Sequence, residues 1–238
     1  MRKPDEPEPH LSNGVPANSP KAFRAVRTNV LFSSAEDGGR SVVVTSTGPG
    51  EGKTLVASNL AVALAQAGQR VLLIDADMRR PRLHELFGQQ QEPGLSNILV
   101  GNAKASQAVH KTPISGLWLL PSGYHPPNPA ELLGSHRYKD FAASLAEHFD
   151  WVVIDSPPVM AVTDAAVIGH SAGGVLFVVG AEMTSRQAAQ KALEQLLAAK
   201  AKLLGGLLNR VNLRRHGYYY SHYYHHRYSR YYNEGSRR

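Results

Sequence analysis

The sequence predicts a single-domain α/β protein built on a mostly parallel, doubly wound sheet that is flanked by helices. Apolar segments of strand length alternate along the chain with segments whose apolar residues recur at helical spacing. The strand segments are apolar at every position rather than at every second one, which is typical of parallel strands covered on both faces. At 238 residues the chain is long enough to bury such a core in one domain.

The expected elements begin with a helix at Ser19 and Pro20, because serine caps a first turn and proline fits inside it. Strands are expected at residues 41–45, 70–76, 117–120, 151–155, 174–179 and 203–211. Further helices are expected at residues 54–67, 83–87, 95–100, 135–149 and 185–200. Helices thus separate most consecutive strands, as the crossover connections of a parallel sheet require.

The two ends of the chain differ from its body. Residues 1–18 hold four prolines and few apolar groups, so we expect them to be disordered. Residues 210–238 hold seven arginines against one glutamate, a net charge of +6, whereas the whole chain carries +7. The sequence therefore divides into a disordered start (1–18), a folded domain (19–213) and a mobile tail (214–238).

Composition argues against several classes of protein. The chain has no cysteine, which excludes disulfides and thiolate metal sites and fits a reducing cytoplasm. Residues 1–20 lack the apolar segment of a signal peptide. The longest apolar run, near residues 173–181, is shorter than the ~18 residues of a membrane span. A basic tail is compatible with binding to nucleic acid or anionic lipid, but its many tyrosines exceed what a phosphate-binding arm needs, so nucleic acid is not the expected partner.

A glycine-rich loop joins the first expected strand to the helix that follows. The loop and its flank read Thr47, Gly48, Pro49, Gly50, Glu51, Gly52, Lys53, Thr54 and Leu55. Strand, loop and helix are the context of a P-loop, whose backbone N–H groups and positive helix end bind phosphates. Lys53 is expected to reach the β- and γ-phosphates of ATP, and the Thr54 hydroxyl to bind Mg²⁺. Thr47 departs from the strict pattern, which has glycine there.

Two apolar strands downstream of the P-loop end in carboxylates. One is followed by Asp75 and Asp77, and the other by Asp155. Ligands of doubly wound folds bind at the carboxyl ends of strands, so these three side chains are expected to lie opposite the phosphates. Mg²⁺ prefers oxygen ligands, one or two of them carboxylates. The alternative for any one of these aspartates is a turn cap.

The tail is rich in tyrosine. Eight of the ten tyrosines of the chain lie within residues 218–232. They are Tyr218, Tyr219, Tyr220, Tyr223, Tyr224, Tyr228, Tyr231 and Tyr232. A nucleotide site in the same chain suggests that the tail is a phosphoryl acceptor.

The ordered set of P-loop, strand end 73–79 and strand end 152–158 resembles the Walker A, Walker A′ and Walker B motifs of the bacterial tyrosine kinases. Other stretches that resemble signatures of this family are residues 23–29, 79–81, 94–96, 126–133 and 162–165. The resemblance covers about residues 19–213, and the tyrosine-rich tail completes it. It implies an ATP- and Mg²⁺-dependent kinase that phosphorylates its own tail and regulates capsular or extracellular polysaccharide synthesis and export. We expect the transfer to occur in trans, because a cationic tail can enter the acidic site of a neighbouring subunit.

The resemblance also implies residue roles. The P-loop lysine and threonine would bind nucleotide and Mg²⁺, and Asp77 and Asp155 would hold the metal or its waters. Either Asp75 or Asp77 would orient or deprotonate the acceptor tyrosine, and the sequence does not separate the two. Asn209 and Arg210 follow the last expected strand and are candidates for adenine contact, with a hydrogen-bonded strand-end asparagine as the alternative.

Assembly and membrane recruitment are implied in the same way. Arg24 and Arg27 match a helix through which members of this family join into homo-oligomeric rings. Lys21 stands where that helix normally has glutamate, so an expected ion pair becomes a repulsion and the ring is expected to be weakened. We expect a free-standing cytoplasmic kinase that a transmembrane activator of the polysaccharide co-polymerase type recruits to the inner face of the plasma membrane. The alternative is a cytoplasmic part of a longer protein. A protein tyrosine phosphatase is the expected opposing partner.

Two other functions compete with the kinase. MinD/ParA-like ATPases share the fold, and a basic tail would then bind DNA or lipid. These ATPases usually carry a signature lysine five residues before the P-loop lysine, where this chain has Gly48. A non-enzymatic scaffold that uses the aromatic tail would not need Lys53 or the strand-end carboxylates. The sequence therefore favours the kinase.

Overall fold

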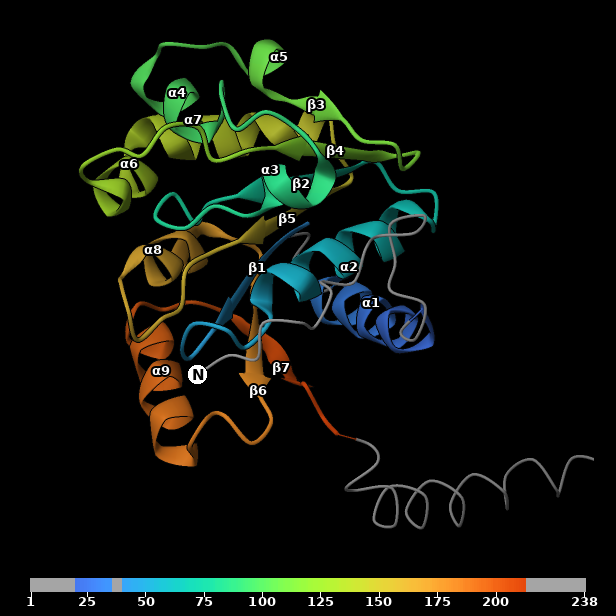
Figure 1. Ribbon diagram of the computed structural model, residues 1–238, viewed down its shortest axis with the longest axis vertical. Coiled ribbons are helices and arrows are strands. Elements are labelled where there is room, and N and C mark those ends of the chain that lie inside the picture. Colours follow the sequence, from blue (N-terminus) through green and yellow to red (C-terminus); the bar gives the residue numbers. More distant parts are fainter. Residues whose placement is uncertain (1–19, 36–39, 213–238) are drawn as a thin grey trace, which may run out of the picture.

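The computed structural model describes residues 20–35 and 40–212, and its strands form one sheet (Figure 1). The strand order is β3-β4-β2-β5-β1-β6-β7, and every neighbouring pair except β3–β4 is parallel. The strands are β1 (Ser41–Ser46), β2 (Val71–Asp75), β3 (His110–Lys111), β4 (Leu117–Leu120), β5 (Trp151–Asp155), β6 (Val175–Gly180) and β7 (Leu203–Asn209). The predicted mostly parallel, doubly wound sheet is confirmed.

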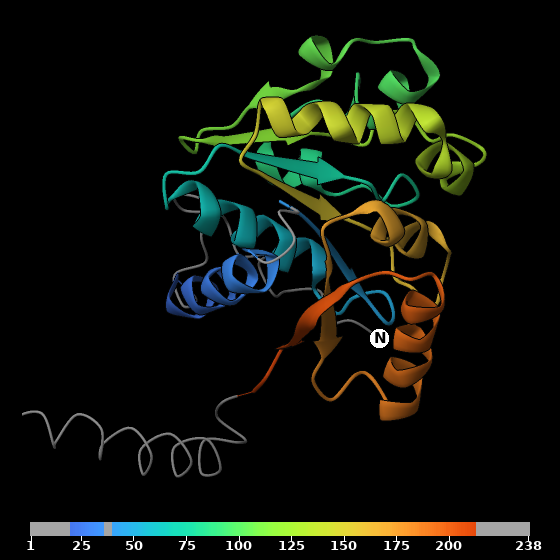
Figure 2. The same cartoon turned by 180° about the vertical axis from the view of Figure 1, so that it is seen from behind.

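The helices cover both faces of this sheet. They are α1 (Pro20–Ala35), α2 (Lys53–Ala65), α3 (Leu83–Phe87), α4 (Leu95–Val100), α5 (Ala105–Ala108), α6 (Pro129–Gly134), α7 (His136–Ser144), α8 (Asp164–Ser171) and α9 (Arg186–Ala198), with a 3-10 turn at Leu145–Glu147. Helices α1 and α2 lie together on one side, and α8 and α9 lie on the other (Figures 1 and 2). The helix expected at 135–149 is α7 followed by the 3-10 turn, and the short elements α5, α6, α8 and β3 were not predicted.

Alternate residues of the central strands pack into two separate cores. Val42 and Val44 of β1 face a cluster that contains the apolar side of α2 and Val30 of α1. Val43 faces the opposite cluster, which includes Phe141 of α7 and Ile168 of α8. All three valines are fully buried. Two buried faces explain why the strands are apolar at every position instead of alternating.

Parallel register brings the important strand ends together. Asp75 is paired directly with Asp155 across β2 and β5, and Val44 of β1 is paired with Asp155 on its other side. Strand β1 leads into the P-loop at this same edge. The carboxyl ends of β1, β2 and β5 therefore meet at one place in the molecule.

Parts of the predicted organisation lie outside the described residues. Residues 1–18 and the tyrosine-rich tail are among them, so their disorder and mobility stay predictions. Lys21 lies in α1, but its side chain is not described either. Across residues 20–35 and 40–212, no helix has both the length and the apolar character to span a membrane.

Gly94, the N-cap of α4, packs closely against the backbone of residues 121–123. A Cβ atom at this position would lie 2.1 Å from the backbone nitrogen of Gly123 and 2.5 Å from the carbonyl oxygen of Pro121. Because backbone atoms cannot move aside as a flexible side chain can, Gly94→Ala is expected to destabilise the fold by about 2 kcal/mol. In a thermal unfolding scan the midpoint should fall by about 4–8 °C.

The matched control is Gly205→Ala, since a Cβ atom on Gly205 meets nothing within 4 Å. This variant should stay within about 0.5 kcal/mol of the unmodified chain. Equal stability of the two alanine variants would contradict the close approach at Gly94.

Candidate active site

The P-loop connects β1 to α2 in a conformation that needs glycine. Gly50 and Gly52 have φ angles of 81° and 92°, in the left-handed region that favours glycine. Gly52 is the N-cap of α2, so the backbone N–H groups of the first helical turn face the loop. A helix N-terminus that follows such a loop is a ready anion site. The loop therefore has the glycine conformations and the helix start that phosphate binding requires, and phosphate binding itself stays a prediction.

Lys53 lies between two strand-end carboxylates. Its Nζ is 3.1 Å from Oδ2 of Asp77 and 4.0 Å from Oδ1 of Asp155. Burial lowers the pKa of Lys53, but the charges of Asp155 and Asp77 outweigh this effect, so its pKa lies above the ordinary value. The P-loop lysine is therefore a stable cation in contact with the ends of β2 and β5.

Asp75 is completely buried and bonded to backbone. Its Oδ1 accepts the N–H of Asp77 at 3.2 Å, and its Oδ2 accepts the N–H groups of Arg82 and Leu83 at 3.0 Å each. These bonds shape the turn after β2 and cap the start of α3. Burial raises the pKa of Asp75 to about 8, an effect to which Asp155 adds and which the N–H groups of Leu83 and Arg82 oppose.

Asp77 and Asp155 differ from Asp75 in their partners. The Oδ2 of Asp77 contacts Lys53, and its Oδ1 accepts the N–H of Arg80 at 3.0 Å. Burial raises the pKa of Asp155 to about 6, although the charge of Lys53 and a hydrogen bond with the Thr54 side chain lower it. Both carboxylates thus border the P-loop directly.

The polar side chains at the carboxyl ends of β1, β2 and β5 are suited to bind a metal ion that is also coordinated by nucleotide phosphates. Oδ1 of Asp155 and Oγ1 of Thr47 are buried and have no hydrogen-bond partner among the described residues. Within those same residues, no group of three or more histidine or acidic side chains is arranged to hold a metal by itself. Mg²⁺ in nucleotide sites takes only one or two carboxylates and completes its shell with phosphate oxygens and water. The donor set fits a Mg²⁺–nucleotide complex.

The structure gives the strand end at Asn209 a contact that the sequence did not specify. Nδ2 of Asn209 donates to the carbonyl oxygen of Glu51 inside the P-loop, at 2.8 Å. Glu51 is 3% exposed, and its carboxylate accepts the N–H groups of Gly48 and Gly180 inside the protein. Arg210 is exposed just after β7. Adenine contact by Asn209 and Arg210 stays a prediction.

An ion pair next to the site was not predicted. Arg79 makes two hydrogen bonds of 3.1 Å to the carboxylate of Asp164, a fully buried residue at the start of α8. The pair ties the turn after β2 to the start of α8. The Nδ1 of His125 contacts the carbonyl oxygen of Met78 in the same turn. The signal for Asp164 was present, because an aspartate in the first turn of a helix is favourable, but its arginine partner lies 85 positions away.

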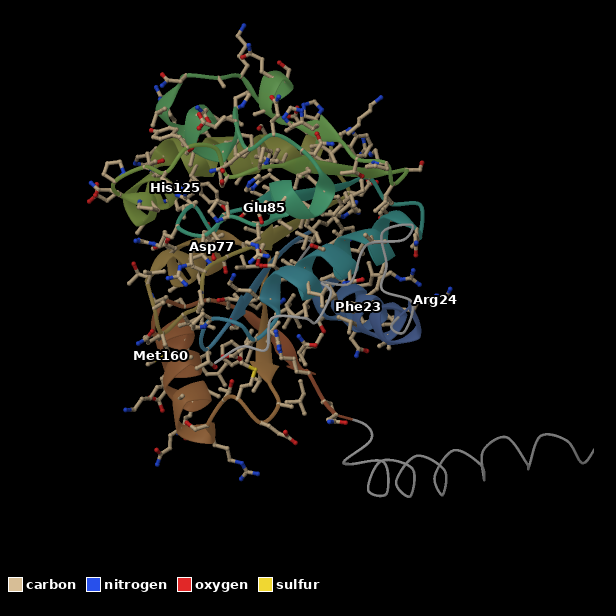
Figure 3. All side chains as sticks on the ribbon, viewed as in Figure 1. Phe23, Arg24, Asp77, Glu85, His125 and Met160 are labelled. Atoms are coloured by element: carbon tan, nitrogen blue, oxygen red, sulfur yellow. The ribbon has the colours of Figure 1, made fainter. Side chains whose placement is uncertain are left out.

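The two arginines of α1 lie away from this edge. Arg24 is exposed, whereas Nη1 of Arg27 donates to the carbonyl oxygen of Ala63 in α2, at 3.0 Å. Figure 3 shows Asp77 on the side of the molecule opposite Arg24. Oligomer formation through α1 stays a prediction, and it would not need to cover the P-loop.

Several known proteins are similar in sequence to this chain over most of its length. A family model described as an AAA domain matches residues 39–205. Tyrosine-protein kinase YwqD of Bacillus subtilis is 42% identical over 200 residues, covering 83% of this chain and 84% of that protein. The putative tyrosine-protein kinase CapB of Staphylococcus aureus is 36% identical over 83% of this chain and 87% of that protein.

Solved structures separate the two candidate families. The kinase domain of the Escherichia coli tyrosine kinase Etk superposes with a TM-score of 0.81 at 35% identity, covering 88% of this chain and 82% of that one. The septum site-determining protein MinD of Pyrococcus horikoshii, complexed with Mg-ADP, gives a TM-score of 0.62 at 27% identity and covers 73% of this chain and 71% of that one. The MinD-like alternative thus shares the nucleotide-binding fold but is less similar in both sequence and structure. The chain belongs to the bacterial tyrosine kinase family.

Proposed function

We propose that the chain transfers the γ-phosphoryl group of ATP to tyrosines of its own C-terminal tail. The observation that carries this proposal is Lys53, held 3.1 Å from Asp77 and 4.0 Å from Asp155 at the P-loop, in a chain with a tyrosine-rich end. In the reaction, the phenol oxygen of an acceptor tyrosine forms a bond to the γ-phosphorus. The bond from that phosphorus to the oxygen of ADP breaks, and the phenol loses its proton.

Each proposed role follows from position. Lys53 would supply a cation to the β- and γ-phosphates, and Thr54 and Asp155 would hold Mg²⁺. The metal, when bound, would neutralise phosphate charge during transfer. The N–H groups at the start of α2 bind phosphate oxygens. Positioning and charge stabilisation thus supply most of the catalysis, as is usual for phosphoryl transfer.

We assign the acceptor-orienting role to Asp77 rather than Asp75. Both oxygens of Asp75 already accept backbone N–H groups, and no part of that residue is exposed. Asp77 is next to Lys53 and its side chain is 6% exposed, so it has a route to an incoming phenol. A free tyrosine has a pKa near ~10 and needs a hydrogen-bond acceptor to lose its proton at neutral pH.

Assembly and context follow from the family resemblance. We propose transfer in trans between subunits of a homo-oligomer, activation by a transmembrane protein at the inner face of the plasma membrane, and reversal by a tyrosine phosphatase. The process regulated would be synthesis or export of capsular or extracellular polysaccharide. Arg24 is exposed on α1 and is available to a second subunit.

Lys53→Met is expected to reduce autophosphorylation by about 10²-fold or more, because it removes the side-chain cation at the γ-phosphate. Phosphotyrosine would be measured after incubation with Mg-ATP, alongside a thermal unfolding scan that reports on the fold. The control is Lys104→Met, which changes an exposed lysine in the same way. Undiminished phosphotyrosine in Lys53→Met would overturn the assignment of the P-loop.

Asn substitutions separate the two aspartates of the turn after β2. Asp77→Asn should lower kcat by about 10²-fold with little change in the unfolding midpoint, because it removes the acceptor for the phenol proton. Asp75→Asn should instead destabilise the fold by about 1–3 kcal/mol, since the new amide places a donor against backbone N–H groups. The assignment fails if Asp77→Asn keeps full kcat.

Removal of residues 214–238 should abolish most autophosphorylation but leave ATP binding intact, because only Tyr124 and Tyr138 remain. Tyr138 is 3% exposed and is a poor acceptor.

Mixing the truncated active chain with full-length Lys53→Met then tests whether transfer occurs between subunits. Label on the inactive chain is the expected result. Strong labelling of the truncated chain would exclude the tail as main acceptor, and an unlabelled inactive chain would exclude transfer in trans.

A further inference from the structure

Two polar side chains fasten the P-loop from within the protein. The Glu51 carboxylate joins the loop to β6, because its Oε1 accepts the N–H of Gly48 at 2.6 Å and its Oε2 accepts the N–H of Gly180 at 2.9 Å. The Asn209 amide joins the loop to β7 through the carbonyl oxygen of Glu51, at 2.8 Å. The loop is thus attached to the ends of two strands that are not its neighbours in sequence.

These contacts are packed closely. A Cβ atom on Gly52 would lie 2.2 Å from Nδ2 of Asn209, so only glycine leaves room for the amide beside the loop. A Cβ atom on Gly180 would lie 3.2 Å from Cγ of Glu51. A residue larger than glycine at Gly52 would displace Asn209, and one at Gly180 would press on Glu51. The loop shape and the two fastening side chains therefore depend on each other.

The charge of Glu51 makes its position informative. A carboxylate next to a phosphate site repels the ligand, and this repulsion is strongest where water is excluded. Glu51 therefore weakens phosphate binding through its charge alone. A favourable effect of this residue has to come from geometry, because donors that are already oriented lose less freedom when the ligand binds.

We propose that Glu51 and Asn209 are positioning residues that hold the P-loop in its phosphate-binding shape before the nucleotide arrives. The affinity for phosphates then depends on β6 and β7 as well as on the loop itself. This inference rests on the proposed function for the identity of the ligand, a nucleoside triphosphate. It gives Asn209 a role at the phosphates, which is distinct from contact with the adenine base.

Magnesium pyrophosphate is the probe that separates these roles, because it has the phosphates of a nucleotide and no base. Titration calorimetry with Mg-pyrophosphate and with Mg-ATP would be done on the full chain and on the variants Glu51→Gln and Asn209→Ala. Each variant should raise the Kd for pyrophosphate by about tenfold, the effect of losing one or two hydrogen bonds. The Kd for ATP should rise by the same factor.

The sign of the Glu51→Gln effect is decisive. Removal of a negative charge beside the phosphates would tighten binding if the residue acted only through its charge. Unchanged or tighter pyrophosphate binding in Glu51→Gln would overturn the proposal. So would an Asn209→Ala variant that loses affinity for ATP while it binds pyrophosphate normally, because that pattern indicates base contact.

Matched controls remove the same groups elsewhere. Glu147→Gln and Asn102→Ala change exposed residues and should leave both affinities unaltered. Thermal unfolding checks each variant, and if Glu51→Gln does not fold, Asn209→Ala decides alone. A phosphotyrosine assay of the unmodified chain tests the proposed function separately, because pyrophosphate affinity does not depend on whether a tyrosine is the acceptor.

Discussion

The site depends on one electrostatic constraint, which is the placement of a single lysine among buried carboxylates. Asp75, Asp77 and Asp155 are each at most 4% exposed, and Lys53 is the cation among them. Such a cluster is unfavourable without compensation, because burial of charge costs several kcal/mol per group. Two arrangements reduce that cost. Asp75 is satisfied by backbone N–H groups, and the raised pKa values of Asp75 and Asp155 show that part of the negative charge is suppressed.

The same constraint explains why the turn after β2 is held from several sides. Arg79 is bound to Asp164 on α8, and His125 contacts the carbonyl oxygen of Met78. Figure 3 shows His125 and Asp77 on the same side of the molecule, away from Phe23 on α1. If the turn moved, the 3.1 Å contact between Asp77 and Lys53 would be lost. Buried polar contacts outside the reacting groups therefore fix the geometry of the carboxylate that we propose as the phenol acceptor.

Sequence patterns predicted the elements that carry a strong local signal. The strand Trp151–Asp155 and the helices Leu83–Phe87 and Leu95–Val100 have the predicted bounds. The sequence missed α6 and α8. Helix α6 begins at Pro129 and ends at Gly134, and α8 contains Gly169, so their proline and glycine residues are typical of loops. In the site, motif spacing located the P-loop and the strand-end carboxylates. It did not reveal that Glu51 faces inward, because its partner Gly180 lies 129 positions away and only the fold brings them together.

The charge of the C-terminal segment also complements that of the site. If ionised, Asp77 and Asp155 outnumber Lys53 by one negative charge, so the strand ends attract cations. The segment 210–238 carries +6 before modification and continues directly from Asn209, the last residue of β7. Each phosphotyrosine adds about −1.5 to −2, so about four bring the segment to zero or slightly below. In the proposed reaction the acceptor is therefore attracted to the site at the start and repelled by the site carboxylates as it becomes product, which favours its release.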